Sequence, residues 1–339
     1  METLHLLEEL IAIDSPSGYT DNAAAFIMRT LEGMGYVPER TAKGAVRCSL
    51  GSSASRLAIA AHTDTLGMIV AAINPNGTLR FSLLGGPLLP SFEGSYVRVH
   101  TTDGRTYDGT VLLNNPSAHS NNKAGSTERS VDTMHVRIDE QVASKDDVLK
   151  LGIRVGDIVA VDPRYRALEN GYVKSHFLDN KAGCFVLFEI ARRCKQEGLN
   201  VPVELFFSTY EEVGHGGAAG WAPSVEEILV VDMGVVGDPL DGSETLCSIC
   251  AKDSGGPYDY TFRTTLTKLA EERSIPHAVD IYPFYSSDGT AAWRAGIDAR
   301  VALIGPGVHA SHGMERTHVN GIVATVDLGM AYIHHSFKE

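Results

Sequence analysis

Apolar residues recur at helical spacing near the start of the chain and then gather into short, dense runs. Leu4, Leu7 and Leu10 predict a helix that the DSPSG segment ends, and a second helix is expected from about Asp21 to Gly33. The runs AVRCSL and LAIAAH follow as short strands. LAIAAH is apolar enough to predict a strand buried on both faces of a sheet.

The pattern changes after Gly67, where apolar and polar residues alternate with a period of two. The runs MIVAAI, TLRFSLL, YVRVH and TYDGTVLL are separated by the turn segments NPNG and Asp103-Gly104, which is typical of antiparallel hairpins. A polar stretch over 114–130 predicts a long loop, and MHVRI and DIVAV flank a short helix at SKDDVLKLG. Residues 68–168 are therefore expected to form a small β-rich domain. Its strands would leave edges that need covering, which suits it to subunit contacts.

Helices and strands alternate again in the rest of the chain. A long helix is predicted from Asp179 to Glu197 and a C-terminal helix over 322–333, with the strands VELFFSTY, EILVVD, HAVDIYPF and VALIG between them. This order predicts an α/β fold: an open, mostly parallel sheet with helices on both faces and a β domain inserted into one loop. Residues 1–67 and 169–339 would form the sheet domain.

The charge balance argues against two classes of partner. The chain has 29 Lys and Arg against 42 Asp and Glu, a formal net charge of −13, so we expect no binding to nucleic acid or to an anionic membrane. The start, METLHLLEEL, lacks the basic residues of a signal peptide, and no stretch approaches the roughly 18–20 apolar residues of a membrane span. Cys247 and Cys250 form a CxxC in an apolar run without nearby histidines, which favours buried free thiols over a zinc or redox site. We expect a cytoplasmic protein.

Candidate metal ligands lie at the ends of the predicted strands or just beyond them. They are His62 and Asp64 in AHTD, Asp179 in LDNKAG, Glu211 and Glu212 in EEVG, Asp232 in VDMG, and His309 and His312 in GVHASHGMER. Ligand sites in open α/β sheets form at the carboxyl ends of strands, so these scattered positions can converge. Imidazole and carboxylate groups together are what a zinc-like ion requires.

Each of these signals has a simpler explanation. A histidine after a strand is often a satisfied core residue, and Asp179 could be only the N-cap of its helix. Adjacent glutamates are usually solvated, but here they directly follow the buried strand LFFSTY, and acids at such an exit need a reason. Together, in this order, the weak signals predict one metal site.

The motifs AHTD, LDNKAG, EEVG and VDMG resemble those of the dinuclear-metal aminopeptidases of the glutamyl, deblocking and tetrahedral type, within the zinc metallopeptidase clan. The resemblance covers essentially the whole chain, including the β insertion after the HxD motif. It implies a zinc-peptidase α/β domain with an inserted dimerisation domain. It also implies a homo-oligomer built from dimers, in this family often a hollow dodecamer.

The same resemblance implies two divalent metal ions per subunit, zinc or alternatively cobalt or manganese. His62 would bind one ion, Asp179 would bridge both, Glu212 and Asp232 would each complete one ion's ligands, and a C-terminal histidine would bind the second ion. Two cations about 3.5–4 Å apart can share a water, lower its pKa toward about 7 and polarise a scissile carbonyl.

Glu211 would then be the general base that takes the proton of this water and delivers it to the leaving amine. Asp64 would orient the His62 ring. Adjacent residues leaving a strand point in different directions, so one glutamate could bind metal while the other faces substrate. His215, in the same loop, is expected to lie near the site without binding metal.

The last ligand is where this chain departs from the family pattern. The family usually has RYxHS there, whereas this chain has GVHASHGMER. We favour His312 over His309, because His312 lies in a polar turn and Glu315 could accept a hydrogen bond from its ring. The departure leaves the substrate open.

The predicted function is a metal-dependent aminopeptidase that acts on short peptides. The alternatives are a deacylase or amidase of a small acylated or amidated peptide metabolite, and a non-catalytic metal-binding assembly subunit. A glucanase would need two opposed carboxylates about 5–10 Å apart, and adjacent glutamates that serve metal argue against it.

Overall fold

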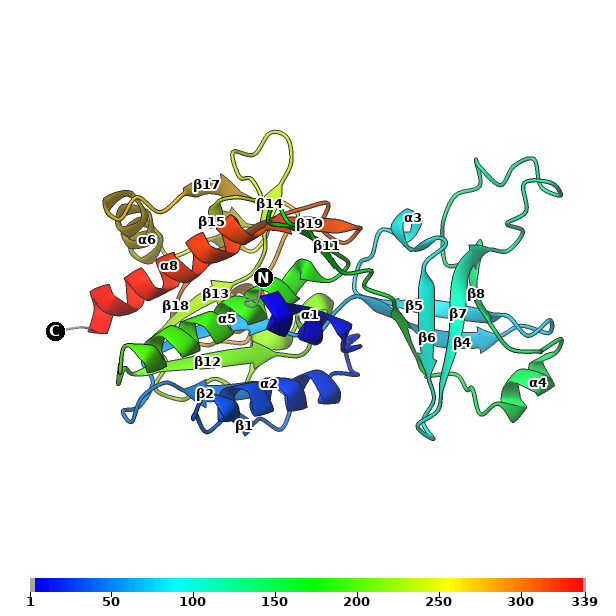
Figure 1. Ribbon diagram of the computed structural model, residues 1–339, viewed down its shortest axis with the longest axis horizontal. Helices are drawn as coiled ribbons and strands as arrows, with labels where there is room; N and C mark the ends of the chain where they lie inside the picture. Colours follow the sequence, from blue (N-terminus) through cyan, green and yellow to red (C-terminus); the bar gives the residue numbers. More distant parts are fainter. Residues whose placement is uncertain (1–3, 338–339) are drawn as a thin grey trace. The chain divides into compact units, whose positions relative to one another are not determined.

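The computed structural model describes residues 4–337 and divides into two compact units. The first unit comprises the residues up to Asp64 and those from Arg164 onward, and the second is Thr65–Pro163. The sequence had placed the insertion at 68–168. Figure 1 shows both units and labels many of their elements.

The first unit combines helices with a sheet of 13 strands. Its helices are α1 (His5–Ala12), α2 (Asp21–Gly33), α5 (Leu178–Gln196), α6 (Tyr260–Glu272), α7 (Asp288–Arg294) and α8 (Val319–Phe337). Its strands are β1 (Glu39–Arg40), β2 (Val46–Ser49), β3 (Leu57–His62), β10 (Arg166–Ala167), β11 (Tyr172–Ser175), β12 (Val203–Ser208), β13 (Glu227–Val231), β14 (Gly234–Val236), β15 (Cys247–Asp253), β16 (Gly256–Pro257), β17 (His277–Ile281), β18 (Arg300–His309) and β19 (Glu315–His318). Two short 3₁₀ turns follow β12, η2 (Glu211–Val213) and η3 (Gly216–Ala218).

The sheet is mixed, so the expectation of a mostly parallel sheet was wrong. Its path runs β1-β2-β12-β3-β13-β18-β19-β11-β10. The central strands β12, β3, β13 and β18 are parallel neighbours, whereas the outer pairs are antiparallel. Short connections such as the one between β18 and β19 allow only antiparallel pairing, and they extend the sheet on both sides of its parallel centre.

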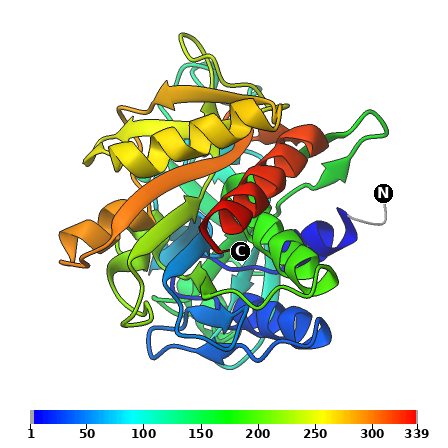
Figure 2. The ribbon, with the colours of Figure 1, turned by 90° about the vertical axis from the view of Figure 1, so that its left-hand side faces the viewer.

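Both faces of the central strands are buried, which explains why LAIAAH is apolar throughout. Leu57, Ile59 and Ala61 belong to one core together with buried residues of α1, α2, α5, α6 and α8. Ala58 and Ala60 point the other way into a second core, which includes residues of α7 and of the loop after η3. Figure 2 shows α5 and α8 lying side by side. The alternation of side chains along a strand produces this division.

The second unit is a closed β-barrel of order β4-β5-β8-β7-β6-β9. Its elements are β4 (Gly67–Ile73), β5 (Leu79–Leu84), α3 (Leu89–Phe92), β6 (Tyr96–His100), β7 (Thr106–Leu113), β8 (Met134–Ile138), α4 (Lys145–Lys150) and β9 (Ile158–Val161). Gly77 and Gly104 adopt positive φ angles of 84° and 83° in the two hairpin turns, a conformation that glycine adopts without strain. The expectation that these strands leave edges to be covered was wrong, because closure of a barrel removes edges.

All five cysteines are free and buried. Cys247 and Cys250 lie on β15 but in different cores, so the CxxC spacing does not bring the two thiols together. Within residues 4–337, no helix has the length and apolar character needed to cross a membrane.

Candidate metal centre

The central parallel strands bring the candidate ligands to one edge of the sheet. His62 ends β3 and Asp232 directly follows β13, and these strands pair in parallel with Ala60 opposite Val230. Ser208, the last residue of β12, is paired with His62, so the η2 turn that carries Glu211 and Glu212 begins beside it. Carboxyl ends of parallel strands therefore carry most of the site, as expected for such sheets.

The buried His62 ring is surrounded by carboxylates. Its Nε2 atom lies 3.1 Å from Asp179 Oδ1, 3.7 Å from Glu211 Oε2 and 3.8 Å from Asp232 Oδ1. The ring, 1% exposed, has its Nδ1 atom 3.0 Å from the backbone oxygen of Asp64. This contact fixes the ring orientation and aims Nε2 at the carboxylates.

His312 lies on the other side of Asp179. Its Nε2 atom is 3.7 Å from Asp179 Oδ2 and 3.7 Å from Glu212 Oε2. Asp179 therefore turns one oxygen toward His62 and the other toward His312. The side chain of His312 is 38% exposed, whereas that of Glu212 is 3% exposed, so this half of the site opens toward solvent at the imidazole.

His309 lies outside this group. It ends β18, pairs with Arg316 across the β18–β19 hairpin and is exposed. In the described chain no contact joins its ring to the clustered carboxylates. His215 stacks on the Tyr210 ring with centroids 5.1 Å apart, and it too is absent from the described clusters of possible ligands.

The cluster has the donors of a cation site without a cationic side chain. Two overlapping groups, His62 with Glu211 and Asp232, and His62 with Asp179 and Glu212, each place their ligand atoms within 4.8 Å of one another. No lysine or arginine among the described residues forms an ion pair with these carboxylates. Glu212 Oε1 is buried and has no hydrogen-bond partner, and an orphaned buried acceptor is costly unless something binds it. The residues present therefore fit divalent metal.

Burial and mutual repulsion shift the pKa values of these acids. Burial raises the pKa of Glu211 and Glu212 well above the usual range and that of Asp232 to about 7, and neighbouring carboxylates add to each rise. Burial disfavours the charged form of His62, but hydrogen bonds and charges of the surrounding acids outweigh it and raise its pKa. Burial also acts to raise the pKa of Asp179, yet His62 outweighs it and the pKa of Asp179 is lowered.

Asp64 holds the turn that carries the two glutamates. Its carboxylate accepts hydrogen bonds from the backbone N–H of Glu211 at 3.1 Å and of Glu212 at 3.3 Å, and from the Ser17 hydroxyl. We had expected Asp64 to act on the His62 ring; its Oδ1 is 3.6 Å from Nδ1 of that ring, and the closer contact is through the backbone. The glutamates diverge because they lie on a 3₁₀ turn, and strand alternation, which the sequence had suggested, is not the cause.

Sequence reasoning missed Asp288, the first residue of α7. It is buried, accepts a hydrogen bond from the Ser208 hydroxyl, and lies against the glycine-rich loop. A Cβ atom added to Gly216 would be 2.3 Å from Asp288 Oδ1 and 2.8 Å from the backbone nitrogen of Glu211. The one sequence signal for Asp288 is its place in the segment SSDG, at the start of a helix. An acid is common at a helix start, so this signal does not by itself indicate a functional residue.

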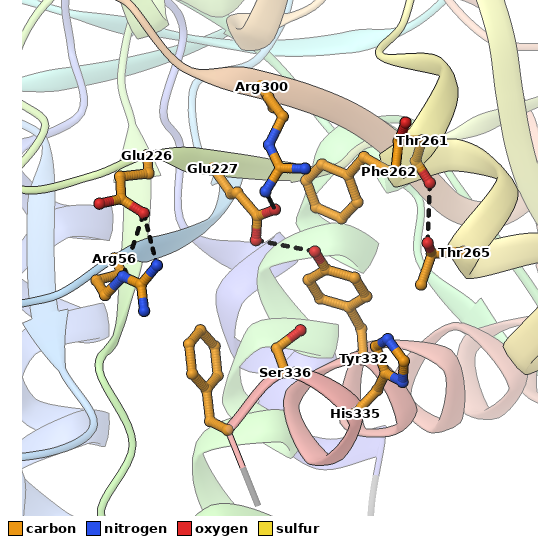
Figure 3. Close-up of a pocket in the computed structure, with 11 residues that line it drawn as sticks. Arg56, Glu226, Glu227, Thr261, Phe262, Thr265, Arg300, Tyr332, His335 and Ser336 are labelled. Carbon is orange, nitrogen blue, oxygen red and sulfur yellow. Dashed lines mark hydrogen bonds and ion pairs between the residues drawn. The ribbon is translucent and has the colours of Figure 1, made fainter.

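A separate pocket of about 270 Å³ lies near the amino ends of β13 and β18. Glu227 lies between Arg300, with which it forms an ion pair, and the Tyr332 hydroxyl, which donates to it at 2.8 Å (Figure 3). Arg56 pairs with Glu226 in the same pocket. Because these charges already satisfy one another, and the carboxyl ends of the strands lie elsewhere, the pocket does not compete with the carboxylate cluster as the reactive site.

The residues of the carboxylate cluster all lie within a stretch that matches a described family. The family model of the M42 glutamyl aminopeptidases matches residues 44–328. The chain belongs to this family. Membership confirms the expected metal-dependent aminopeptidase.

Relatives and solved structures match this aminopeptidase along its length. "Putative aminopeptidase YhfE" of Bacillus subtilis (strain 168) is 39% identical over 336 residues, covering 98% of this chain and 97% of its own. The TET aminopeptidase of Thaumarchaeota archaeon SCGC AB-539-E09 superimposes with a TM-score of 0.88 at 20% identity, covering 100% of this chain and 98% of its own. The dodecamer PhTET1-12s gives 0.86 at 22% identity, covering 100% of both chains. At such identity these structures support the fold alone.

Proposed function

We propose that this M42 aminopeptidase binds two divalent metal ions, zinc or alternatively cobalt or manganese. His62, Asp179 and Asp232 would hold one ion, and Asp179, Glu212 and His312 the other. The observation that carries this division is the position of Asp179, whose Oδ1 is 3.1 Å from the His62 ring and whose Oδ2 is 3.7 Å from the His312 ring. A carboxylate with its two oxygens aimed at two imidazoles suits a bridging ligand.

When bound, two such ions supply Lewis-acid chemistry, because they polarise a carbonyl and lower the pKa of water toward about 7. This chain's own residues then move the proton. Glu211 accepts it from the attacking water and passes it to the leaving amine. Its side chain is 12% exposed, against 3% for Glu212, so of the two glutamates it is the one more open to solvent and substrate.

Asp64 supports these separate roles of Glu211 and Glu212, because its one carboxylate accepts hydrogen bonds from the backbone N–H groups of both glutamates. Fixing the turn lets Glu212 face His312 while Glu211 faces the His62 side. General-base catalysis depends on such placement within hydrogen-bond reach of the proton that moves. We therefore assign Glu211 to proton transfer and Asp64 to positioning.

The substrate we propose is a short peptide with a free amino end. The same ions and base would cleave an acylated or amidated peptide metabolite, so the substrate class needs a direct comparison. Hydrolysis of aminoacyl-anilides and of N-acyl amino acids by the metal-loaded protein separates the two. Faster hydrolysis of the anilides is expected; a clear preference for N-acyl amino acids would make the protein a deacylase.

We also propose that the protein is a dimer-based homo-oligomer that extends to a dodecamer such as that of PhTET1-12s, and that the barrel unit carries the subunit contacts. The buried free thiols suit a reducing compartment such as the cytoplasm.

A further inference from the structure

Glu315 is a buried carboxylate that the proposed chemistry leaves without a role. It is the first residue of β19, is 2% exposed, and lies in register opposite Ser175 at the end of β11. Its Oε2 atom accepts a hydrogen bond from the backbone N–H of Asp179 at 3.0 Å, and its Oε1 atom accepts one from the backbone N–H of His312 at 3.1 Å. One side chain thus joins the two segments that carry these ligands.

Those two segments contain backbone that needs support. Phe177, just before α5, has a φ angle of 69°, and Ala310 and His312, in the turn after β18, have φ angles of 58° and 61°. Residues with a Cβ atom rarely adopt this left-handed conformation and do so where surrounding contacts hold them. Glu315 accepts from the N–H groups of both Asp179 and His312, and His176 Nδ1 lies 2.6 Å from the Gly313 carbonyl oxygen. Both sets of contacts therefore join the same two segments.

The geometry also separates Glu315 from the ligands themselves. Each of its oxygens accepts a hydrogen bond from a backbone N–H group, and Glu315 is absent from the described clusters of possible metal ligands. No lysine or arginine of the described chain forms an ion pair with it. A buried carboxylate that accepts two backbone N–H bonds acts as a brace, because its two acceptors fix the separation of the two donors.

We propose that Glu315 is a positioning residue that sets the separation of Asp179 and His312 and so builds the second metal site before the ion arrives. This inference rests on the proposed function, because Asp179 and His312 are ligands only in that proposal. It also explains how this chain can use the GVHASHGMER turn: the acid three residues after His312 holds the backbone of that histidine.

The test is the Glu315→Gln variant, with Glu204→Gln as a matched control. Glutamine keeps the shape of Glu315, but its NH₂ group cannot accept, so one of the two N–H groups faces a donor. Glu204 is also a carboxylate that is 2% exposed and accepts a backbone N–H, that of Ala222 at 3.1 Å, and it lies outside the cluster. Each variant loses one buried carboxylate oxygen. Glutamine at 204 can keep its remaining oxygen on the N–H of Ala222, whereas glutamine at 315 cannot accept from both N–H groups.

Metal-free wild type and both variants would be titrated with Zn²⁺ by calorimetry and with Co²⁺ by absorption, which reports coordination geometry. We expect two ions in wild type and in Glu204→Gln. In Glu315→Gln the second ion should bind about 10- to 100-fold more weakly, the usual cost of losing a group that orients a ligand, and the Co²⁺ spectrum of that ion should change. Excess metal should restore its occupancy.

Equal affinities for both ions in Glu315→Gln and wild type would overturn the inference, as would an equal loss in the two variants, which would indicate a general effect of removing a buried acceptor. If wild type itself binds no metal, the proposed function fails instead, so the two failures are distinguishable.

A measurement on unaltered protein covers the case in which Glu315→Gln does not fold. Hydrogen exchange of the metal-free wild type, resolved to the amides of Asp179 and His312, reports whether the brace exists before metal binds. Slow exchange at both amides is expected. Exchange of the His312 amide at the rate of an unprotected amide would overturn the inference.

Discussion

Glu211 and Glu212 are chemically identical neighbours whose surroundings differ. Glu211 Oε2 lies 3.7 Å from the His62 ring, whereas Glu212 Oε2 lies 3.7 Å from the His312 ring and its Oε1 is buried without a partner. Glu211→Gln should therefore retain both ions and lose about 10²-fold or more in kcat, the usual cost of removing a general base. Glu212→Gln should lose the second ion. Metal content and kcat, measured on both variants, check this; the reverse pattern would exchange the two roles.

The raised pKa values in the cluster predict how metal binding depends on pH. Burial raises the pKa of Asp232 to about 7 and those of both glutamates well above their usual range, which favours the protonated forms of these acids in metal-free protein. His62, whose pKa is raised as well, must also lose a proton to bind metal. Of the proposed ligands, His62, Glu212 and Asp232 therefore release protons on binding, and the apparent affinity should fall as pH is lowered through about 7. Zn²⁺ titrations at pH 6 and pH 8 in two buffers of different ionisation enthalpy measure this; equal affinity at both pH values would contradict it.

At the scale of elements, the glycine-rich segment 214–217 after η2 has no room for a side chain at Gly216. A Cβ atom at Gly216 would lie 2.3 Å from Asp288 Oδ1 and 2.8 Å from the Glu211 nitrogen, so the loop must move. Gly216→Ala should therefore lower kcat by about 10- to 100-fold by displacing Glu211, since small misplacements of a catalytic group are this costly. Bound metal should change less. Gly237→Ala, where nothing lies within 4 Å of the new atom, is the control; equal kcat in the two variants would refute the argument.

Sequence patterns predicted the elements that carry the site better than the contacts within it. LAIAAH was predicted as a strand buried on both faces because its apolar residues are continuous, and β3 has this form. The mixed pairing of the sheet was not predicted, because strand direction depends on connections such as the β18–β19 turn. The pattern of apolar residues carries no signal for such connections. Asp288 and the backbone role of Glu315 were not predicted, because neither residue comes directly after a predicted strand and hydrogen bonds to backbone N–H groups leave no trace in residue type.

At the scale of the whole molecule, the barrel unit contributes no residue to the carboxylate cluster. Neither core of the first unit contains a residue of 65–163, and every residue of the carboxylate cluster lies outside that range. Replacing 65–163 by a short linker should therefore leave a folded unit that still binds metal but has a smaller assembly, because we assign subunit contacts to the barrel. Light scattering gives the mass, and circular dichroism with a metal titration checks the fold. An unchanged assembly would contradict this assignment.

The central proposal is catalysis by a cluster in which two metal ions share Asp179. Its most direct test is to titrate exhaustively chelated protein with Zn²⁺ while following hydrolysis of an aminoacyl-anilide. We expect no hydrolysis without metal and a rise in the rate of hydrolysis that ends at two ions per subunit. The His312→Ala variant should stop binding near one ion per subunit. Full activity in the metal-free protein would contradict it.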